Sequence, residues 1–279
     1  MRLARVSKDG KIGLAAKSGN RVTIAYGAEL ADLDKQIAAG SLAEAGAKAA
    51  AGEEVDEASL TFLPPVVRPS KILCMGLNYR DHAEESGLGI PEFPVLFARF
   101  PSSLIGHGAP IILPKVSSQL DWEAELVVVL ARGGKNIAQA DALGHVAGYS
   151  VFNDASIRDY QVLTPQWTAG KNFDDTGAFG PWLVTPDELP AGAAGLKIEC
   201  RLNGTVMQSS NTGNLIFDVA RTISLLSSFM TLEAGDVLVM GTPGGVGVAR
   251  NPQVWMKAGD ICEVEVEGIG LLRNPIVAE

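Results

Sequence analysis

Cysteine is scarce in this chain, with three residues among 279. The three, Cys74, Cys200 and Cys262, are odd in number and far apart, without the paired spacing of a disulfide framework. We therefore expect reduced thiols and a cytoplasmic protein.

The sequence also lacks long apolar runs and basic clusters. Hydrophobic residues make up 47% of it, yet no run is long enough to span a bilayer, and the opening MRLARVSKDG turns polar too early for a signal peptide. The 32 acidic residues outnumber the 23 basic ones, for a net charge of −9. This balance argues against nucleic acids and anionic membranes as partners.

The composition changes along the first quarter of the chain. Residues 1–26 alternate apolar and polar side chains, which predicts a short β meander, whereas residues 27–59 have helical spacing. The prolines of LTFLPPVVRPS, residues 60–70, then interrupt regular structure. We predict a small N-terminal α+β domain over 1–66 and a main domain over 67–279.

The main domain consists mostly of short apolar segments separated by Gly and Pro, the pattern of many short strands. The candidate strands are KILCMGLN, PIILP, AELVVVLA, HVAGYSVFN, GPWLVT, LKIECRLNG, DVLVMGTP and DICEVEVEGIG. Helical spacing occurs around residues 137–145 and 214–230, where Ile216 and Val219 begin an apolar face. The expected fold class is a mixed, β-rich α+β fold.

The segment DWEAELVVVL, residues 121–130, places carboxylates at the start of an apolar strand. Glu123 and Glu125 would share one face of it, opposite Ala124 and Leu126. Adjacent carboxylates repel each other and are costly to bury unless something neutralises them. The strand could end in solvent, or a divalent cation could lie between the two acids.

Three features favour the cation. The run after Glu125 is apolar on both faces, as in a central strand. A second apolar run ends at Asn153 and Asp154, and GTPGGVG, residues 241–247, is a loop whose amides could approach a small ligand. Oxygen ligands without Cys or His select hard ions such as Mg²⁺ or Mn²⁺.

These segments together resemble the fumarylacetoacetate hydrolase family over roughly residues 70–279. In order along the chain, the matching motifs are GLNYRDHAEE, PVLFARFPSSLIG, LDWEAELVVV, AGYSVFNDASIRDYQ, GKNFDDTGAFGPWLV and GTPGGVG. The resemblance implies a β-sandwich roll with a divalent metal at one end of the sheets. It also implies a homodimer, and a variable N-terminal domain before the matching region.

The resemblance also assigns roles to single residues. Its metal triad corresponds to Glu123, Glu125 and Asp154, which would hold Mg²⁺ or Mn²⁺; Asp121 lies outside that triad. Its catalytic residues correspond to His82, Glu85 and Lys171. His82 and Glu85 are one helical turn apart, so their side chains can meet.

Four further residues correspond to substrate-binding positions: Arg158, Gln161, Arg99 and Thr242. Arg99 replaces a lysine that many relatives carry, which leaves its contact with a substrate acid group open beside a structural role. His107 and His145 match no catalytic position of the family. The stretch from residue 79 to residue 91 has no core pattern, and we expect a lid there that carries His82.

The resemblance implies an enzyme acting on 2-oxo acids with a second carbonyl group. The first hypothesis is a metal-dependent C–C hydrolase that cleaves an acylpyruvate, with His82 and Glu85 activating water. The alternative is a 2-oxo acid decarboxylase or an enol–keto isomerase, which would use the same stabilised enolate. A binding protein without catalytic activity is the third, and the complete set of site residues argues against it.

Overall fold

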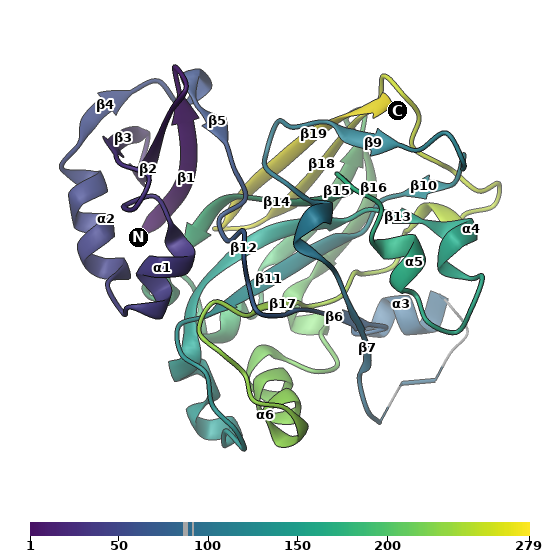
Figure 1. The fold of residues 1–279 in the computed structure, drawn as a ribbon. Coiled ribbons are helices and arrows are strands. Elements are labelled where there is room, and N and C mark those ends of the chain that lie inside the picture. Colours follow the sequence, from purple (N-terminus) through teal and green to yellow (C-terminus); the bar gives the residue numbers. More distant parts are fainter. Residues whose placement is uncertain (86–88, 91) are drawn as a thin grey trace.

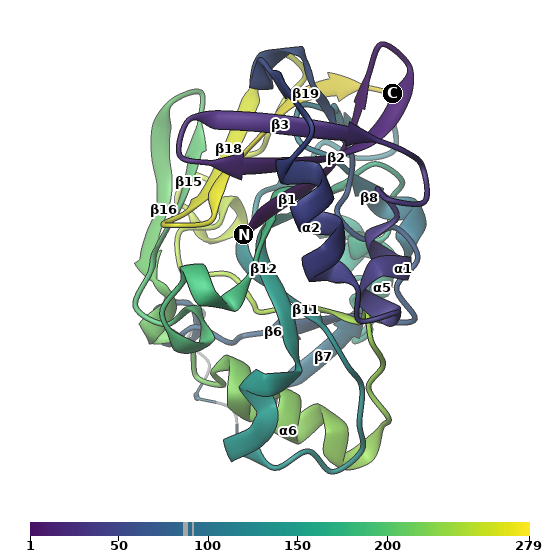
Figure 2. The same ribbon diagram turned by 90° about the vertical axis from the view of Figure 1, so that its left-hand side faces the viewer.

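The structure is a computed structural model that describes residues 1–85, 89–90 and 92–279 (Figure 1). The N-terminal residues form the predicted meander of β1 (Arg2–Lys8), β2 (Lys11–Ser18) and β3 (Arg21–Tyr26). Two helices, α1 (Leu33–Ala38) and α2 (Leu42–Ala50), follow, and α2 packs on β2 and β3 (Figure 2).

The N-terminal meander continues the main sheet. Strand β1 pairs antiparallel with β14 (Gly177–Val184), with Leu3 opposite Leu183, and also with β5 (Thr61–Phe62). The edge strand is β4 (Glu53–Val55). The N-terminal unit is therefore joined to the rest by backbone hydrogen bonds, and a domain boundary near residue 66 stays a prediction.

The main sheet runs in the order β4-β3-β2-β1-β14-β12-β11-β17-β6-β7. Its remaining strands are β6 (Ile72–Gly76), β7 (Val95–Ala98), β8 (Leu104–Ile105), β11 (Ala124–Leu130), β12 (Val146–Asp154) and β17 (Val237–Val239). Strand β11 lies between β12 and β17 and is buried along its whole length. A strand covered on both faces needs apolar side chains on both, so the prediction of a central strand is confirmed.

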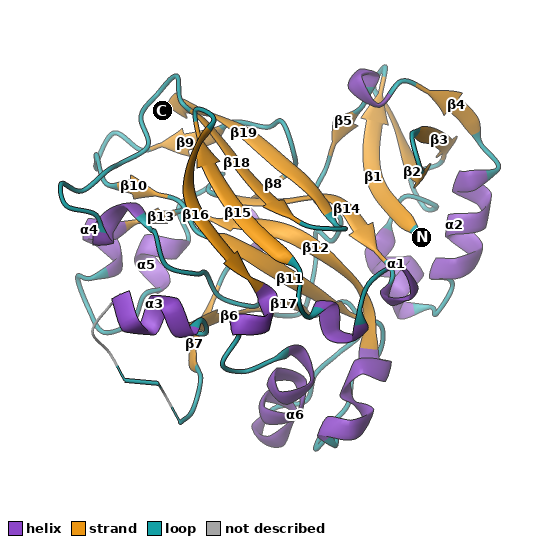
Figure 3. Ribbon diagram, turned by 180° about the vertical axis from the view of Figure 1, so that it is seen from behind, coloured by secondary structure: helices purple, strands orange, loops and turns teal. Residues whose placement is uncertain are grey.

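A second sheet packs across β11, β12 and β14 (Figure 3). Its order is β16-β15-β18-β19-β9. The strands are β9 (Ile111–Leu113), β15 (Lys197–Leu202), β16 (Thr205–Asn211), β18 (Ile261–Val266) and β19 (Gly270–Ala278). Alternate residues of β18 are buried, because one face of this sheet covers the core and the other faces water. The β-rich α+β fold expected from the sequence is confirmed.

Helices lie at two ends of this sandwich. α6 (Val219–Phe229) packs against the 3-10 helix at Gln139–His145. The sequence pattern predicted a helix from Ile216, but Asp218 caps the amide of Arg221 and starts the helix later. The other 3-10 helices are Glu57–Ser59, Pro101–Ser103, Pro186–Glu188, Ala191–Ala193, Thr212–Asn214 and Gly247–Ala249. No described helix is long and apolar enough to cross a membrane.

Three short helices gather beside the ends of β11 and β12 (Figure 1). They are α3 (Arg80–Glu85), α4 (Arg158–Gln161) and α5 (Thr168–Lys171). A small sheet of β10 (Leu120–Asp121) and β13 (Ser156–Ile157) lies next to them. This end of the molecule holds the predicted site residues.

Candidate active site

Three buried carboxylates meet where β11 begins and β12 ends. The antiparallel register puts Glu125 opposite Phe152 and Ala124 opposite Asn153, so Asp154 ends β12 beside the start of β11. One ligand atom from each of Glu123, Glu125 and Asp154 lies within 4.8 Å of the others. The predicted triad is therefore assembled by the strand register itself.

Lys171 bridges two of these carboxylates. Its Nζ atom lies 2.7 Å from Glu123 Oε2 and 2.7 Å from Asp154 Oδ2. Arg99 bonds the other oxygen of Asp154 and also donates to Thr176 Oγ1 at 2.7 Å. Burial alone would raise the pKa of Glu123, but Lys171 and Arg158 outweigh it and hold that pKa at about 2. Glu123 therefore stays ionised at neutral pH.

Glu125 differs from its neighbours because it has no ion pair with a described residue. Its Oε2 atom accepts a hydrogen bond from the amide of Gly241. Burial, followed by the nearby charges of Asp154 and Glu123, raises the pKa of Glu125 well above the usual range. A divalent cation beside Glu125 would favour its ionised form and so offset this rise.

Asp121 forms a second buried charge pair behind the triad. Its Oδ2 atom accepts from Arg158 Nε at 2.7 Å and from the Val248 amide at 3.0 Å. Its Oδ1 atom accepts from the Gly247 amide at 2.7 Å. Asp121 lies in β10, which pairs with β13 in a separate small sheet, whereas β11 begins at Ala124 in the main sheet. Asp121 lies outside the triad and connects Arg158 to the glycine-rich loop.

The helix α3 carries a histidine–glutamate pair. His82 Nδ1 lies 3.3 Å from Glu85 Oε2, and the Gly245 amide donates to Glu85 Oε1 at 3.0 Å. The hydrogen bond from His82, and to a smaller extent that from Gly245, lowers the pKa of Glu85. Asp81 Oδ2 accepts from Ser210 Oγ at 2.6 Å, which ties the helix to β16. The predicted lid extends to residues 86–88 and 91, which lie outside the described structure.

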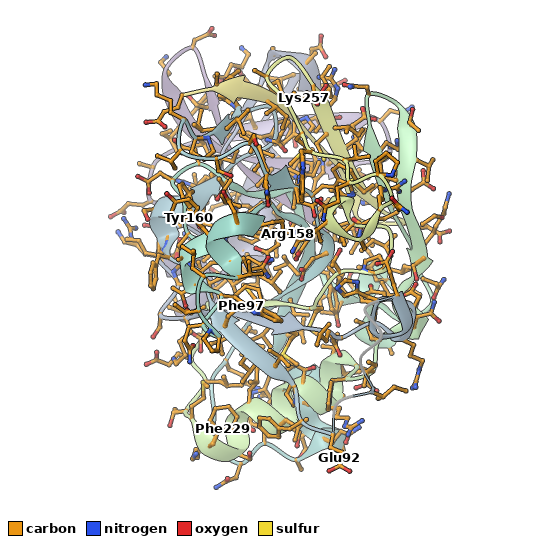
Figure 4. All side chains as sticks on the ribbon, turned by 90° about the vertical axis from the view of Figure 1, so that its right-hand side faces the viewer. Glu92, Phe97, Arg158, Tyr160, Phe229 and Lys257 are labelled. Atoms are coloured by element: carbon orange, nitrogen blue, oxygen red, sulfur yellow. The ribbon has the colours of Figure 1, made fainter. Side chains whose placement is uncertain are left out.

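A cavity of about 540 Å³ joins these parts. His82, Glu123, Arg158, Gln161, Lys171 and Thr242 line it. Arg158 and Phe97 lie near the middle of this end of the molecule, between Lys257 and Phe229 at its far edges (Figure 4). The imidazole of His82 therefore lines the same cavity as the carboxylate of Glu123 and the cations of Arg158 and Lys171.

A comparison with known protein families shows to which family this chain belongs. The family described as "Fumarylacetoacetate (FAA) hydrolase C-terminal" matches this chain over residues 71–277, which is most of its length. The chain belongs to the fumarylacetoacetate hydrolase family. The resemblance of its motifs to that family is thereby confirmed.

Relatives within the fumarylacetoacetate hydrolase family carry names for different reactions. "Oxaloacetate tautomerase Fahd2a, mitochondrial" from Rattus norvegicus is 44% identical over 224 residues, which is 80% of this chain and 71% of the relative. The solved fumarylacetoacetate hydrolase from Exiguobacterium antarcticum is 32% identical, with a TM-score of 0.88 and 100% coverage of both chains. The solved 5-carboxymethyl-2-hydroxymuconate delta-isomerase from Mycobacterium smegmatis is 29% identical, with a TM-score of 0.79 and 100% coverage of both chains. Family membership therefore supports an enzyme, either a hydrolase or an isomerase.

Not all residues matched to the family motifs face the cavity. Arg99 is 2% exposed and lies behind Asp154, where it bonds that carboxylate and Thr176. This position favours a supporting role for Arg99, and its contact with substrate stays a prediction. His107 accepts the Arg273 amide at 3.1 Å, and His145 Nδ1 lies 3.1 Å from the carbonyl of Arg132, both away from the cavity lining.

Thr242 belongs to the glycine-rich loop after β17. Its hydroxyl accepts from Gln208 Nε2 at 2.8 Å, while Gln208 Oε1 accepts the amide of Ala124 at 2.9 Å. Thr242 also lines the cavity, and a hydroxyl that accepts one hydrogen bond can still donate another. Gly245 has a φ of +101°, and a Cβ there would lie 2.3 Å from the Met207 carbonyl, so this turn requires glycine.

Several cavity residues were not predicted from the sequence. They are Gly76, Leu77, Phe97, Gln119, Val162, Trp167, Val246, Val248 and Gln253. All nine are uncharged and come from strands and loops that are separate in the sequence, so none belongs to a pattern that indicates chemistry. Only the family motifs near some of them, such as PVLFARF around Phe97, could have pointed to them.

The residues of the cluster fit a hard divalent cation. Every donor of the triad is a carboxylate oxygen, the ligand type that Mg²⁺ and Mn²⁺ prefer. The buried cluster holds four carboxylates and three cations: Asp121, Glu123, Glu125 and Asp154 with Arg99, Arg158 and Lys171. When all are ionised the net charge is −1, and a divalent ion would change it to +1. A site of that charge attracts an anionic ligand.

Proposed function

We propose that this protein is a divalent-metal-dependent enzyme that transfers a proton on a 2-oxo acid with a second carbonyl group, a keto–enol tautomerase. Oxaloacetate is the simplest substrate of this class. The observation that carries the proposal is that His82, held by Glu85, lines the same cavity as Glu123 and Lys171. Proton transfer next to a carbonyl needs a base on one side and stabilisation of negative charge on the other.

Glu123, Glu125 and Asp154 would hold Mg²⁺ or Mn²⁺ through their carboxylate oxygens. When bound, the ion supplies Lewis-acid polarisation of the 2-oxo group, which acidifies the neighbouring C–H bond. All three ligands are buried, and of the three Glu123 is the one that lines the cavity.

His82 would take the proton from the carbon between the two carbonyl groups and return it to oxygen or carbon. Its Nδ1 atom faces Glu85, so the other ring nitrogen, Nε2, is the one that can act as the base. Glu85 stabilises the imidazolium that forms and is itself held by the Gly245 amide. His82, stabilised by Glu85, therefore holds the proton after it leaves the substrate carbon and until it is returned to the substrate.

Arg158 and Lys171 would bind and stabilise the anionic substrate. Arg158 uses Nε for Asp121 and Nη1 for Glu123 and Gln161, whereas its buried Nη2 has no partner in the described structure. An unpaired buried donor is costly, and a substrate carboxylate would satisfy it. The Thr242 hydroxyl can donate to the second carbonyl oxygen.

The test is a tautomerisation assay on protein stripped with a chelator and reloaded with Mg²⁺ or Mn²⁺. Loss of enol absorbance from freshly dissolved enol-oxaloacetate should accelerate only with metal, and the acceleration should disappear in Glu125→Gln and fall at least 100-fold in His82→Gln. Pyruvate is measured in parallel, because its release would indicate decarboxylation. A rate equal to that of protein-free buffer in the metal-loaded protein rules out the tautomerase.

Hydrolysis of a C–C bond in an acylpyruvate is the second candidate. A His82–Glu85 pair can equally deprotonate water, and the relative from Exiguobacterium antarcticum is named a hydrolase. Water would add to the second carbonyl, the C–C bond would break, and pyruvate and a carboxylic acid would leave. Pyruvate formed from acetylpyruvate or fumarylpyruvate, and lost in His82→Gln, would establish this reaction. Pyruvate from oxaloacetate that persists in His82→Gln would instead indicate a decarboxylase.

The oligomeric state and the compartment remain proposals. We propose a homodimer on the basis of the family resemblance, and a cytoplasmic location on the basis of the cysteine content. Light scattering at micromolar concentration should give twice the 29.3 kDa mass of the chain, and a monomeric mass would refute the dimer.

A further inference from the structure

The cavity has two chemically different ends. Its fully buried lining residues include Glu123, Arg158 and Lys171, which carry the charges. The lining toward solvent includes His82, Gly76 and Leu77. Its other members, here called the outer subsite, are the half-buried Phe97, Gln119, Trp167 and Val248 and the exposed Val162 and Gln253. None of these six carries a charge, and four are apolar.

An aromatic wall forms one side of the outer subsite. The rings of Phe97 and Trp167 meet edge to face, with centroids 5.7 Å apart. Trp167 lies directly against the backbone of Gly76, where a Cβ would be 2.4 Å from its ring. The Nζ atom of Lys171 is 5.0 Å from the centroid of Phe97. A substituent extending outward from a carbonyl near Lys171 therefore meets this wall first.

The outer subsite offers no partner for a second anionic group. All lysines, arginines and histidines of the chain are among the described residues, and of these only His82, Arg158 and Lys171 line the cavity. Arg158 and Lys171 lie at the buried end of the cavity, where both pair with Glu123 at 2.7 Å and where the proposed function assigns them to the 2-oxo acid core. A carboxylate moved into the outer subsite would lose hydration without gaining an ion pair, whereas apolar carbon would gain from burial.

The cavity is also larger than a four-carbon acid requires. Its volume of about 540 Å³ lies in the range of pockets that enclose drug-sized ligands. We infer that the preferred substrates are 2-oxo acids whose second carbonyl carries an uncharged aliphatic or aryl group of several carbons, and that Phe97 and Trp167 set this specificity. The inference rests on the proposed function for the 2-oxo acid core, which the charged end of the cavity holds.

Binding of unreactive analogues tests the inference without turnover. N-(3-methylbutyl)oxamate and N-(2-carboxyethyl)oxamate share the 2-oxo acid core and have tails with the same number of non-hydrogen atoms, one neutral and one anionic. Calorimetric titration of the metal-loaded protein should show the neutral ligand binding at least 10-fold more tightly. Equal affinities, tighter binding of the anionic ligand, or no binding of either would overturn the inference.

Substitutions in the aromatic wall and its surroundings test whether these residues cause the preference for the neutral ligand. Trp167→Ala should weaken the neutral ligand about 10-fold but weaken tail-free oxamate less than 3-fold, with Phe229→Ala, at an exposed phenylalanine outside the cavity lining, as the matched control. Gln119→Arg should strengthen the anionic ligand about 10-fold by supplying the missing cation. If Trp167→Ala does not fold, the same loss of affinity for the neutral ligand is tested with Val162→Asp. The Val162 side chain is 75% exposed, so this substitution should not disturb folding. Unchanged ligand preference in these variants would refute the assignment.

Kinetics separate failure of the subsite from failure of the proposed function. Benzoylpyruvate should show a kcat/KM at least 10-fold above that of fumarylpyruvate, its anionic-tailed counterpart. Turnover of both without this preference refutes the subsite and leaves the function standing. Binding of the oxamates in the expected order without turnover of any 2-oxo acid refutes the function and leaves the subsite standing.

Discussion

The two halves of the candidate active site are built in opposite ways. The proposed metal half, formed by Glu123, Glu125 and Asp154, lies on two central strands and directly before one of them, and Lys171 bridges two of its carboxylates at 2.7 Å. The base half lies on the short helix α3, where His82 and Glu85 have side chains that are 15% and 28% exposed and lie 3.3 Å apart.

This difference separates two requirements of the same reaction. A cluster of like charges must be held by buried partners, because any relaxation would separate or hydrate the carboxylates. A base that admits substrate and releases product must lie on an element that can move at small cost. Changes in the metal half should therefore affect folding or metal affinity in addition to turnover, and changes in the base half should affect rates and local opening with little effect on global stability.

The largest effect is expected at Glu125. Because this carboxylate has no ion pair in the described structure, Glu125→Gln should leave the metal-free protein as stable as the parent. Loss of one of three ligands should weaken Mn²⁺ binding on the order of 100-fold and reduce turnover on the order of 1,000-fold. Calorimetric Mn²⁺ titration measures the first, with Glu29→Gln, whose side chain is 93% exposed, as control. Parent-like Mn²⁺ affinity would show that the ion binds elsewhere.

Lys171 should show the reverse pattern, with a large effect on folding. Lys171→Met leaves Glu123 and Asp154 without their shared cation, and breaking a buried pair costs about 3 kcal/mol or more. Urea unfolding with a chelator present measures this loss, and Lys35→Met, at a side chain 62% exposed, serves as control. Divalent metal should restore part of the stability. A stability loss as small as that of the control would mean that the cluster relaxes easily.

The metal half was also the part that the sequence made visible. Alternation in DWEAELVVVL and the end of the next apolar run at Asp154 indicate two neighbouring strands, and their register alone brings the acids together. The His82–Glu85 pair was likewise predictable in part, because both residues lie on one turn of a helix. Such patterns can be recognised because the residues concerned are close together in the sequence.

The outer parts of the site were not predictable in this way. Trp167 lines the cavity because it lies against Gly76 from a distant loop, and no local pattern records that contact. Arg99 was matched to a substrate-binding position, yet it is buried just after β7 and its guanidinium bonds Asp154. Asp121 precedes Glu123 and Glu125 in the same segment of sequence, but it lies in β10, which belongs to a different sheet from β11, and it pairs with Arg158. Long-range packing decides all three.

Asp121 allows a test of how the two halves are connected. Asp121→Asn keeps the shape of the side chain but loses the charge that holds Arg158 and the Gly247 and Val248 amides. We expect KM to rise about 10-fold, kcat to fall less than 3-fold and Mn²⁺ affinity to stay within 2-fold. Steady-state kinetics with Asp141→Asn, an exposed position, as control measures the split. A change confined to kcat would place Asp121 in the chemistry instead of in the positioning of Arg158.

The smallest effect concerns the contact between α3 and the glycine-rich loop. The hydrogen bond from His82 and then that from the Gly245 amide lower the pKa of Glu85 in the folded protein. A carboxyl group with a lowered pKa contributes stability above its unfolded pKa of about 4.3 and loses it as the pH falls through the folded value. Hydrogen exchange at the Gly245 amide, corrected for intrinsic rates, should therefore stay constant from pH 8 to about pH 5 and accelerate a few-fold in more acidic solution. Glu85→Gln should show fast exchange at every pH, while β11 amides stay protected in both proteins. Protection at Gly245 that persisted well below that range in the parent would mean that the charge of Glu85 does not hold this contact. Loss of protection in β11 together with Gly245 would mean that the two halves open as one unit, so that their separate construction has no dynamic consequence.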